Sequence, residues 1–302
     1  MIADESVALG VPVYERTEKL RNLLESAESV PIDTIYVADN GHIDERRELY
    51  DTDFEFDLVA IDVEYDSGLG NCRRSIVDRL DEDYLVIADS DHTVPENVTT
   101  LVDQLRARPE FGGVCGLLFE HDGLRGTCHD LYERGDILVR DIRGKEADLV
   151  AGQPLVEFDF LQNVAAFRRE CVEEYAWDPQ LQQGKPHLDF YVGHKRRTDW
   201  RFGCCPAVQF PHYPGGGSSY TANRNKRERL MDAREYFLDK WRYRQIVYGQ
   251  LEWLETQDRL PSDGRVAELL AKRAITRLPV ELQARVTDAR QFVRKLQGRP
   301  PL

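Results

Sequence analysis

Residues 84–91 of the chain read YLVIADSD, and residues 92–96 continue as HTVPE. The apolar run at 84–88 has the length of a buried strand, and the acidic triplet Asp89-Ser90-Asp91 follows it directly. Thr93 and Glu96 have the spacing of a capping box, with a proline near the expected helix start. The stretch therefore predicts a buried strand, two carboxylates at its carboxyl end, and a helix after them.

The same alternation of strand and helix fills the first third of the chain. Apolar runs predict strands at 6–13, 33–39, 58–62 and 84–88. Repeated strand–helix units form a mainly parallel sheet with helices on both faces, and ligands bind such sheets at the carboxyl ends of the strands. These ends carry Val13-Tyr14, Asp39-Asn40, Asp62 and the acidic triplet. We therefore expect an α/β fold with its site at this edge.

The later part of the chain is less regular and then helical. Strand-like runs lie at 114–119 and 158–167, and the glycine-rich stretch 123–152 fits a hairpin or a mobile loop. The glycine run at 214–219 is typical of a flexible loop or linker. Helical patterns follow at 226–255, 266–276 and 280–296. We expect an α/β domain over 1–220, with halves 1–110 and 111–220, and a helical extension over 221–302.

The chain of 302 residues is acidic, with a formal net charge of −14. This charge argues against general nucleic-acid binding. Lysine is scarce, at 8 residues against 32 arginines, which indicates a salt-rich cytoplasm, although an ordinary acidic protein also fits. No apolar run reaches the roughly 20 residues of a membrane span. The start, MIADES, lacks the features of a secretory signal, so we expect a cytoplasmic location.

The charge is unevenly distributed, because residues 259–302 carry 10 Lys/Arg and 4 Asp/Glu. This tail of net charge +6 leaves −20 for the remainder. A basic helical tail fits peripheral contact with an anionic membrane surface, or with a lipid-linked phosphate acceptor. Packing against acidic neighbours of the same chain is the alternative. The six cysteines contain no C-x-x-C pair, and we expect reduced, mostly buried thiols.

The acidic triplet has the composition of a cation site. Two carboxylates separated by one residue can hold one divalent cation, which neutralises the diphosphate of a sugar nucleotide. Hard oxygen ligands suit Mg2+ or Mn2+. The same spacing occurs at 51–53 and 81–83, so the position after a buried strand is what distinguishes Asp89 and Asp91. A solvated acidic turn is the alternative.

Four stretches of the first half resemble family 2 glycosyltransferases of the GT-A fold. They are VALGVPVYER at 7–16, IYVADNG at 35–41, GLGNCRR at 68–74 and the stretch at 84–95. His42, Cys72 and Arg74 depart from the family's usual Ser, Ala and Asn. The resemblance implies that 1–110 is the nucleotide-binding half and 111–220 the acceptor and catalytic half. It implies donor binding by Pro12, Tyr14, Arg16, Asp39, Arg73, Asp89 and Ser90.

For two of these donor-binding residues the sequence offers a second interpretation. Asp39 can be a turn residue that caps its own backbone, and Arg73 can be a surface arginine of a helix.

A second block resembles transferases that act on galactose or N-acetylhexosamine acceptors. It comprises FLQNVAAFR at 160–168, WDPQLQQGKPHLDFY at 177–191 and CPAVQFPH at 205–212. The acidic residue that precedes the histidine in this pattern is absent here, where Lys185 and Pro186 stand. The resemblance implies acceptor binding by His187 and Trp177, and a metal site of Asp89, Asp91 and His212. An imidazole ligand favours Mn2+ over Mg2+.

Asp189 is the predicted general base of this block. An acceptor hydroxyl is weakly nucleophilic and needs a base within hydrogen-bond reach. Each role has a simpler alternative: Asp189 as an N-cap, His187 as a backbone partner, Trp177 as a packed side chain, and His212 as a loop residue.

The predicted function is inverting transfer of a hexose or hexosamine from a UDP-sugar to a hydroxyl acceptor. That acceptor is expected to be a glycan or a polyprenyl-linked oligosaccharide. One competing class is a nucleotidyltransferase, which should carry an early glycine-rich, basic phosphate loop that residues 10–15 lack. Another is a non-catalytic carbohydrate-binding relative of the same fold. It is distinguished by whether Asp89, Asp91, Asp189 and His212 converge on one cleft.

Overall fold

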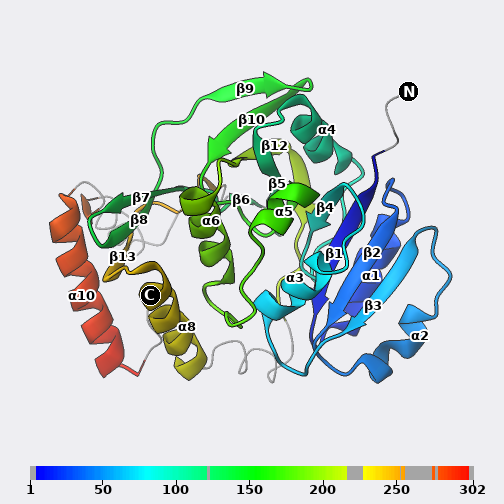
Figure 1. The fold of residues 1–302 in the computed structure, drawn as a ribbon, viewed down its shortest axis with the longest axis horizontal. Coiled ribbons are helices and arrows are strands. Elements are labelled where there is room, and N and C mark those ends of the chain that lie inside the picture. The colour runs from blue at the N-terminus through cyan, green and yellow to red at the C-terminus, as the bar shows by residue number, and fades with distance from the viewer. Residues whose placement is uncertain are drawn as a thin grey trace.

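The computed structural model describes residues 5–120, 123–215, 227–251, 253–255, 274–275 and 278–298 (Figure 1). Its main sheet has the strand order β3-β2-β1-β4-β11-β5-β12-β10-β9. The first four strands in sequence are parallel neighbours: β1 (Val7–Val13), β2 (Thr34–Asp39), β3 (Asp57–Asp62) and β4 (Tyr84–Ile87). The mainly parallel α/β fold predicted from the sequence is confirmed.

The second half of the sheet is mixed. β11 (Ala165–Arg168) lies antiparallel between β4 and β5 (Phe111–Glu120), and β12 (Arg201–Pro211) runs parallel to β5. The remaining strands of this sheet are β6 (Gly123–Gly126), β9 (Ala147–Val150), β10 (Gln153–Phe158) and β14 (Leu254–Glu255). A second sheet of three strands has the order β13-β8-β7, with β7 at Asp130–Arg134, β8 at Ile137–Asp141 and β13 at Gln245–Tyr248.

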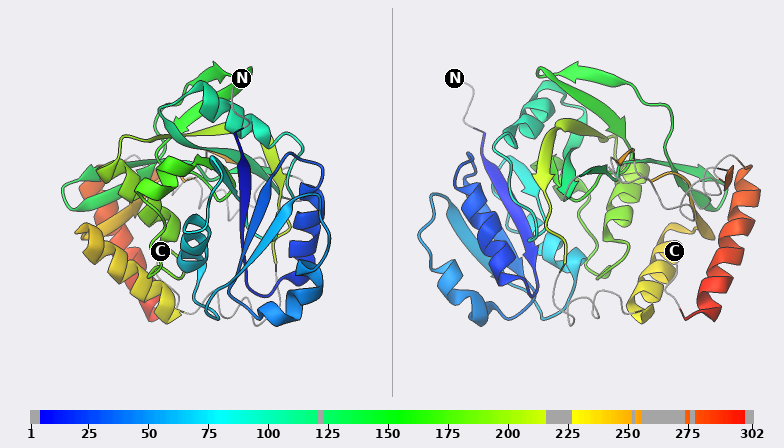
Figure 2. Two further views of the ribbon diagram at one scale, coloured as in Figure 1. Left: turned by 45° about the vertical axis from the view of Figure 1, so that its right-hand side comes forward. Right: turned by 180° about the vertical axis from the view of Figure 1, so that it is seen from behind.

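Helices cover both faces of the parallel strands, and Figure 2 shows α1 and α3 on opposite sides of β1–β3. Leu20 and Leu24 of α1 belong to one apolar core, and Cys72 and Ile76 of α3 belong to the other. The helices are α1 (Thr17–Ala27), α2 (Arg47–Tyr50), α3 (Leu69–Val77), α4 (Thr99–Ala107), α5 (Arg169–Glu174), α6 (Pro186–Arg197), α8 (Arg227–Trp241) and α10 (Val280–Leu296), with a 3-10 turn at Ile43–Arg46.

The helix after the acidic triplet begins later than the capping box predicts. α4 starts at Thr99, and no side chain caps it. Thr93 instead donates its backbone N–H to the carbonyl of Pro211, 3.0 Å away, so this stretch pairs with the end of β12. The apolar face that was predicted for the helix is confirmed, because Leu101 and Leu105 are fully buried.

Two further predictions on secondary structure are corrected. The run at 158–167 is not one strand, because β10 ends at Phe158 and β11 begins at Ala165. The helix predicted at 226–255 ends at Trp241, and β13 and β14 follow it. These two strands pair with β8 and β6, so the segment after 220 contributes to both sheets.

The structure also bears on three predictions for the later part of the chain, at 123–152, 266–276 and 280–296. Residues 123–152 form strands β6 to β9, and the antiparallel pair β7–β8 confirms the hairpin among the two predicted alternatives. The helix predicted at 266–276 lies mostly outside the described residues, whereas the helix at 280–296 is confirmed as α10. Among the described helices, none combines the length and the apolar character that a membrane span needs. The division at residue 220 stays a prediction.

Candidate active site

A cavity of about 690 Å³ opens at the carboxyl ends of the parallel strands. Its volume falls in the range of small-molecule sites. The wall includes residues that follow β1, β2 and β4, as strand-end binding requires. Eight of the predicted site residues line it: Pro12, Tyr14, Arg16, Asp89, Ser90, Asp91, His187 and His212.

The backbone after β4 and the backbone after β12 bring Asp91 and His212 together. The N–H of Tyr213 donates to the carbonyl of Asp91 at 2.8 Å, and His92 and His212 form an isolated bridge. Nε2 of His212 lies 3.3 Å from Oδ2 of Asp91. Two residues about 120 positions apart in the chain therefore present their ligand atoms to the same cavity wall.

Glu120, at the end of β5, hydrogen-bonds to the ring nitrogen of His212 that does not contact Asp91. Its Oε1 lies 2.7 Å from Nδ1 of His212. Burial alone would lower the pKa of His212, but hydrogen bonds to Asp91 and Glu120 outweigh it and raise the pKa. Burial would raise the pKa of Asp91, yet His212 and the Arg16 guanidinium hold it below its ordinary value. Asp91 is therefore ionised at neutral pH.

A divalent cation fits Asp91 and His212. The carboxylate and imidazole atoms already converge, and Glu120 supplies the partner that orients a metal-binding histidine. His92 belongs to the same group of nearby ligand atoms. However, its Nδ1 accepts the N–H of Asp89 at 3.0 Å, and burial lowers its pKa to about 4. A neutral imidazole in that tautomer carries its hydrogen on Nε2, so His92 supports the site rather than binding a cation.

Asp89 faces the cavity but is engaged differently from Asp91. Its Oδ1 accepts a hydrogen bond from Nη2 of Arg73 at 3.1 Å, and its Oδ2 accepts one from Asn163 at 3.1 Å. Among the described residues, the compact ligand group contains Asp91, His92 and His212 but not Asp89. Of the predicted metal ligands, Asp91 and His212 therefore lie together, whereas Asp89 forms an ion pair with Arg73.

Arg73 lies behind the cavity wall rather than on the surface of α3. Its side chain is 1% exposed, which excludes the interpretation as a surface helix arginine. Nη1 of Arg73 lies 2.6 Å from Nδ1 of His187. Burial, and then the Arg73 charge, hold the pKa of His187 well below its ordinary value. His187 is therefore a neutral imidazole that lines the cavity at the first turn of α6.

Asp39 does not line the cavity, contrary to its predicted donor-binding role. It is fully buried and forms an ion pair with Arg46 at 3.0 Å. Tyr50 donates a further hydrogen bond at 2.7 Å, and the N–H of Gly41 donates one at 2.9 Å. The bond from Gly41 supports the interpretation of Asp39 as a turn residue. Its neighbour Asn40 lines the cavity in its place.

Trp177 is a core residue and not an acceptor platform. Its side chain is 1% exposed and its ring stacks on Phe190, with 4.2 Å between the centroids. Phe167 meets the same ring edge-on. The simpler alternative, a packed aromatic side chain, is what the structure shows.

Asp189 is the most consequential correction. It is fully buried, is absent from the cavity wall, and accepts hydrogen bonds from Trp241 at 2.7 Å and Tyr175 at 3.0 Å. Lys240 of α8 forms an ion pair with it at 2.8 Å. Both of its oxygens are therefore hydrogen-bonded within the protein, and the structure does not present Asp189 to the cavity. Of the four residues expected to converge, Asp89, Asp91 and His212 do so.

Sequence reasoning missed several residues of the cavity. Glu120 directly follows the strand predicted at 114–119, so the strand-end rule that selected Asp39 and Asp89 would have found it. Tyr65 is not part of the cavity lining, but it is half exposed beside Tyr14, which is, with 2.8 Å between their hydroxyl oxygens. Leu230 of α8 also lines the cavity, although nothing in the local sequence signals this, because it depends on how α8 packs.

Comparisons with known proteins concern the family and the fold of the chain. The model of the family described as Glycosyl transferase family 2 matches residues 9–176. A crystal structure of residues 1–349 of TarS from S. aureus is 10% identical, with a TM-score of 0.51, covering 90% of this chain and 71% of that one. The same fragment in complex with UDP-GlcNAc is 13% identical, with a TM-score of 0.51 and coverages of 78% and 66%.

A third similar structure is GalNAc-T7 with UDP, GalNAc and Mn2+. It is 13% identical, with a TM-score of 0.56, covering 80% of this chain and 50% of that one. The chain thus spans half the length of GalNAc-T7, and at these identities the likeness concerns the fold. A search of curated protein sequences gave no match.

Proposed function

The chain belongs to glycosyl transferase family 2 and uses a nucleotide sugar, and we propose that it transfers a hexose or hexosamine from a UDP-sugar to a hydroxyl group with inversion. The observation that carries this proposal is the Asp91–His212 pair, held by Glu120, on the wall of a cavity at the ends of the parallel strands. A carboxylate and an imidazole at that position suit a cation that binds a diphosphate.

The nucleoside fits the part of the cavity formed by the first half of the chain. Pro12, Tyr14 and Asn40 line it, and Tyr65 extends the aromatic surface of Tyr14. His42 stacks on Tyr65 with 4.7 Å between the centroids. Exposed aromatic faces of this kind stack on planar bases. Support for UDP comes from the similar TarS structure, which is a complex with UDP-GlcNAc.

Mn2+ is the cation that we propose for Asp91 and His212, with Mg2+ as the weaker candidate. An imidazole ligand favours Mn2+, and the similar GalNAc-T7 structure contains Mn2+. When bound, the cation supplies positive charge to the leaving diphosphate. Arg16 already forms an ion pair with Asp91, so the chain places a second positive charge at the same wall.

His187 replaces Asp189 as the proposed general base. It lines the cavity and is neutral because of burial and Arg73. In the proposed step the acceptor hydroxyl displaces Arg73 from the unprotonated nitrogen of His187, its oxygen attacks the anomeric carbon, the bond to the diphosphate breaks, and the hydroxyl proton passes to that nitrogen. Burial and the Arg73 charge keep the pKa of His187 low, and the nearby Asp89 carboxylate opposes them by favouring the imidazolium that forms.

We expect His187→Gln to lower kcat for transfer by about 10²- to 10⁴-fold, the usual contribution of a general base. Donor affinity should change little, because glutamine retains a polar side chain beside Arg73. The measurement is transfer kinetics together with the dissociation constant of the UDP-sugar. A full rate with the variant would rule out His187 as the base.

A panel of nucleotide sugars with and without Mn2+ tests the function itself. A ligand that binds the native state raises the melting temperature, and about 100-fold excess over its dissociation constant adds about 2.7 kcal/mol. We expect UDP-hexoses or UDP-hexosamines to stabilise the chain only with Mn2+. Stabilisation by nucleoside triphosphates instead would favour a nucleotidyltransferase.

We also propose that the acceptor is lipid-linked and that α10 contacts an anionic membrane surface. One face of α10 packs on β13, while the opposite face exposes Leu282, Phe292, Val293 and Leu296. The last turn adds Arg294 and Lys295, and α10 lies at the edge of the molecule (Figure 1). An amphipathic helix with basic flanks binds such surfaces.

Replacement of Phe292, Val293 and Leu296 by serine should reduce co-sedimentation with anionic liposomes several-fold. Leu149→Ser is the matched control, because Leu149 is 77% exposed on β9 and lies outside α10. Equal recovery of the native chain and the triple variant would refute the membrane contact and leave the transferase proposal intact.

A further inference from the structure

Three buried cysteines from three segments meet inside the second half of the sheet. Cys115 of β5 and Cys204 of β12 are direct partners in adjacent parallel strands, so their side chains project from the same face. Cys128, between β6 and β7, approaches them, with 3.5 Å between its sulfur and that of Cys115. All three residues are fully buried, and all three sulfurs lie within 4.8 Å of one another.

The backbone around these thiols is fixed by one side chain. Gln162 accepts a hydrogen bond from the N–H of Thr127 at 3.0 Å and donates one to the carbonyl of Gly116. Thr127 precedes Cys128 and Gly116 follows Cys115, so a single amide holds both cysteines in position. Gln162 and Thr127 also line the cavity, which places the thiols just behind its wall.

We propose that Cys115, Cys128 and Cys204 form a buried, three-coordinate thiolate site for a soft monovalent cation of the Cu+ type. Soft thiolates select such cations. Metal–sulfur bonds of about 2.3 Å in a trigonal plane put the sulfurs roughly 4 Å apart. The present separations are close to that spacing, so little movement of the strands is needed.

Simple packing of thiols is the competing explanation, because a free cysteine behaves as a small apolar side chain. The other buried cysteines fit it: Cys72, Cys171 and Cys205 are outside this group. The cluster differs because its thiols also interact with one another. The Cys115 and Cys128 sulfurs are in contact, and Cys204 completes a group that comes from three separate segments of the chain.

Coordination number decides which cation is expected. Structural Zn2+ is almost always four-coordinate. In the described part of the chain, no fourth His, Cys, Asp or Glu ligand atom joins the three sulfurs. Each metal–sulfur bond replaces an S–H bond, so three protons are released to solvent when the cation binds. The oxidation state of the cation does not change, and no oxidant or reductant takes part.

Anaerobic titration of the intact chain with Cu+ against a competing chelator tests the site. We expect one tightly bound equivalent, with sulfur-to-copper charge-transfer absorption in the ultraviolet. Cys128→Ala should weaken binding by at least about 100-fold, since it removes a direct ligand. Cys205→Ala is the matched control, because Cys205 adjoins Cys204 but belongs to the core on the other face of the sheet. It should bind as the native chain does.

X-ray absorption of the unmodified chain loaded with one equivalent of Cu+ keeps the test independent of how the variants fold. Three sulfur neighbours at about 2.3 Å are expected. Nitrogen or oxygen neighbours would overturn the proposal by placing the cation at Asp91 and His212. Tighter binding of Zn2+ than of Cu+, or equal loss in the Cys128 and Cys205 variants, would overturn it as well. None of these outcomes depends on transferase activity.

Discussion

Asp91→Asn is expected to abolish Mn2+-dependent binding of the donor and to lower transfer by about 10³-fold. The variant removes the charged oxygen that lies 3.3 Å from His212, while the amide keeps nearly the same shape. Stabilisation of a leaving diphosphate by a metal ion is worth several kcal/mol, which corresponds to a rate factor of this size. The measurements are thermal stabilisation by the UDP-sugar with and without Mn2+, and kcat/KM for transfer.

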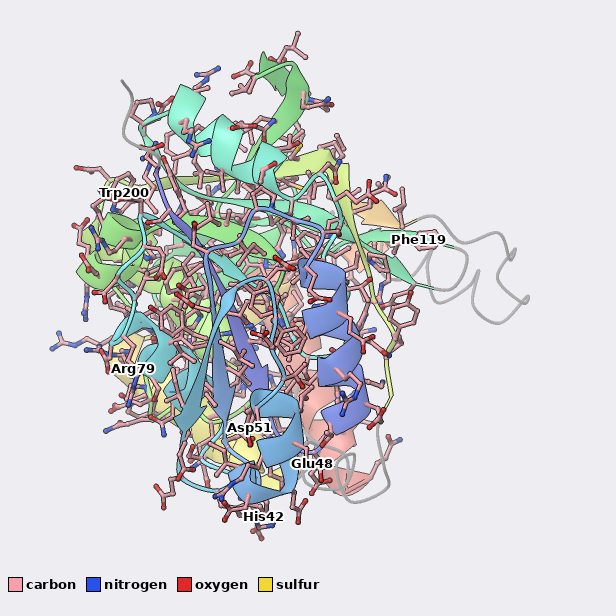
Figure 3. All side chains as sticks on the ribbon, turned by 90° about the vertical axis from the view of Figure 1, so that its right-hand side faces the viewer. His42, Glu48, Asp51, Arg79, Phe119 and Trp200 are labelled. Carbon is pink, nitrogen blue, oxygen red and sulfur yellow. The ribbon has the colours of Figure 1, made fainter. Side chains whose placement is uncertain are left out.

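Asp53→Asn is the matched control for this experiment. It changes the same chemical group in a second D-x-D triplet, at 51–53, whose residues are exposed. Asp51 of that triplet lies at the end of α2, on the outside of the molecule (Figure 3). The control should bind Mn2+ and donor as the native chain does. If Asp91→Asn keeps Mn2+-dependent donor binding, Asp91 is not a ligand and the proposed metal site is wrong.

The parallel half of the fold could be predicted because each of its strands is a local signal. β2 and β4 are apolar runs with polar residues directly after them, and their observed bounds lie within a residue of the predicted ones. The helix start at Thr93 was wrong because its N–H is used by Pro211, more than a hundred residues later. No local pattern contains such a pairing.

The same limit explains which of the predicted site residues lie on the cavity wall. Tyr14 and Asp91 follow strands, and the strand-end rule places them on the cavity. Asp189 looked like a base because its neighbours 190 and 191 are aromatic and it stands at a helix start. Its environment is set by α8, which lies some 50 residues further along. Burial that depends on a distant helix cannot be derived from the sequence around the residue.

The strands β13 and β14 were missed for a related reason. Gln245–Tyr248 is a short apolar run, which fits a helix as well as a strand when taken alone. It becomes a strand because β8 offers it a parallel partner, with Val247 opposite Val139. β8 itself lies in the stretch 123–152, whose sequence fits either a hairpin or a loop. Because the sequence does not identify β8 as a strand, it also does not identify β13, and the helix predicted at 226–255 is too long.

The ion pair between Asp189 and Lys240 joins α6 to α8, and its loss should affect stability far more than catalysis. Asp189 is fully buried, and Lys240 also binds Asp178 at 2.6 Å. Burial would lower the pKa of Lys240, but its hydrogen bonds to the two carboxylates outweigh it and raise the pKa. Removing one partner of a buried pair leaves an uncompensated charge, which costs about 3–5 kcal/mol.

We expect Lys240→Met to lower the free energy of unfolding by about 3–5 kcal/mol, because it leaves the Asp189 charge buried. Asp189→Asn should cost less, since the amide can still accept from Trp241. The double variant should be more stable than the sum of the two effects predicts, because the two residues interact. Urea denaturation of the native chain and the three variants measures these differences. Lys195→Met, which breaks an exposed pair with Asp159, should cost at most about 1 kcal/mol.

The decisive comparison is between stability and turnover in Asp189→Asn. If Asp189 only anchors α8, kcat measured well below the melting temperature should stay within about 10-fold of the native value. KM is expected to rise, because Leu230 at the start of α8 forms part of the cavity wall. A general base would show the reverse, with kcat lost by about 10²-fold or more and KM little changed. That second result, in a variant as stable as the native chain, would restore Asp189 as the base and remove His187 from that role.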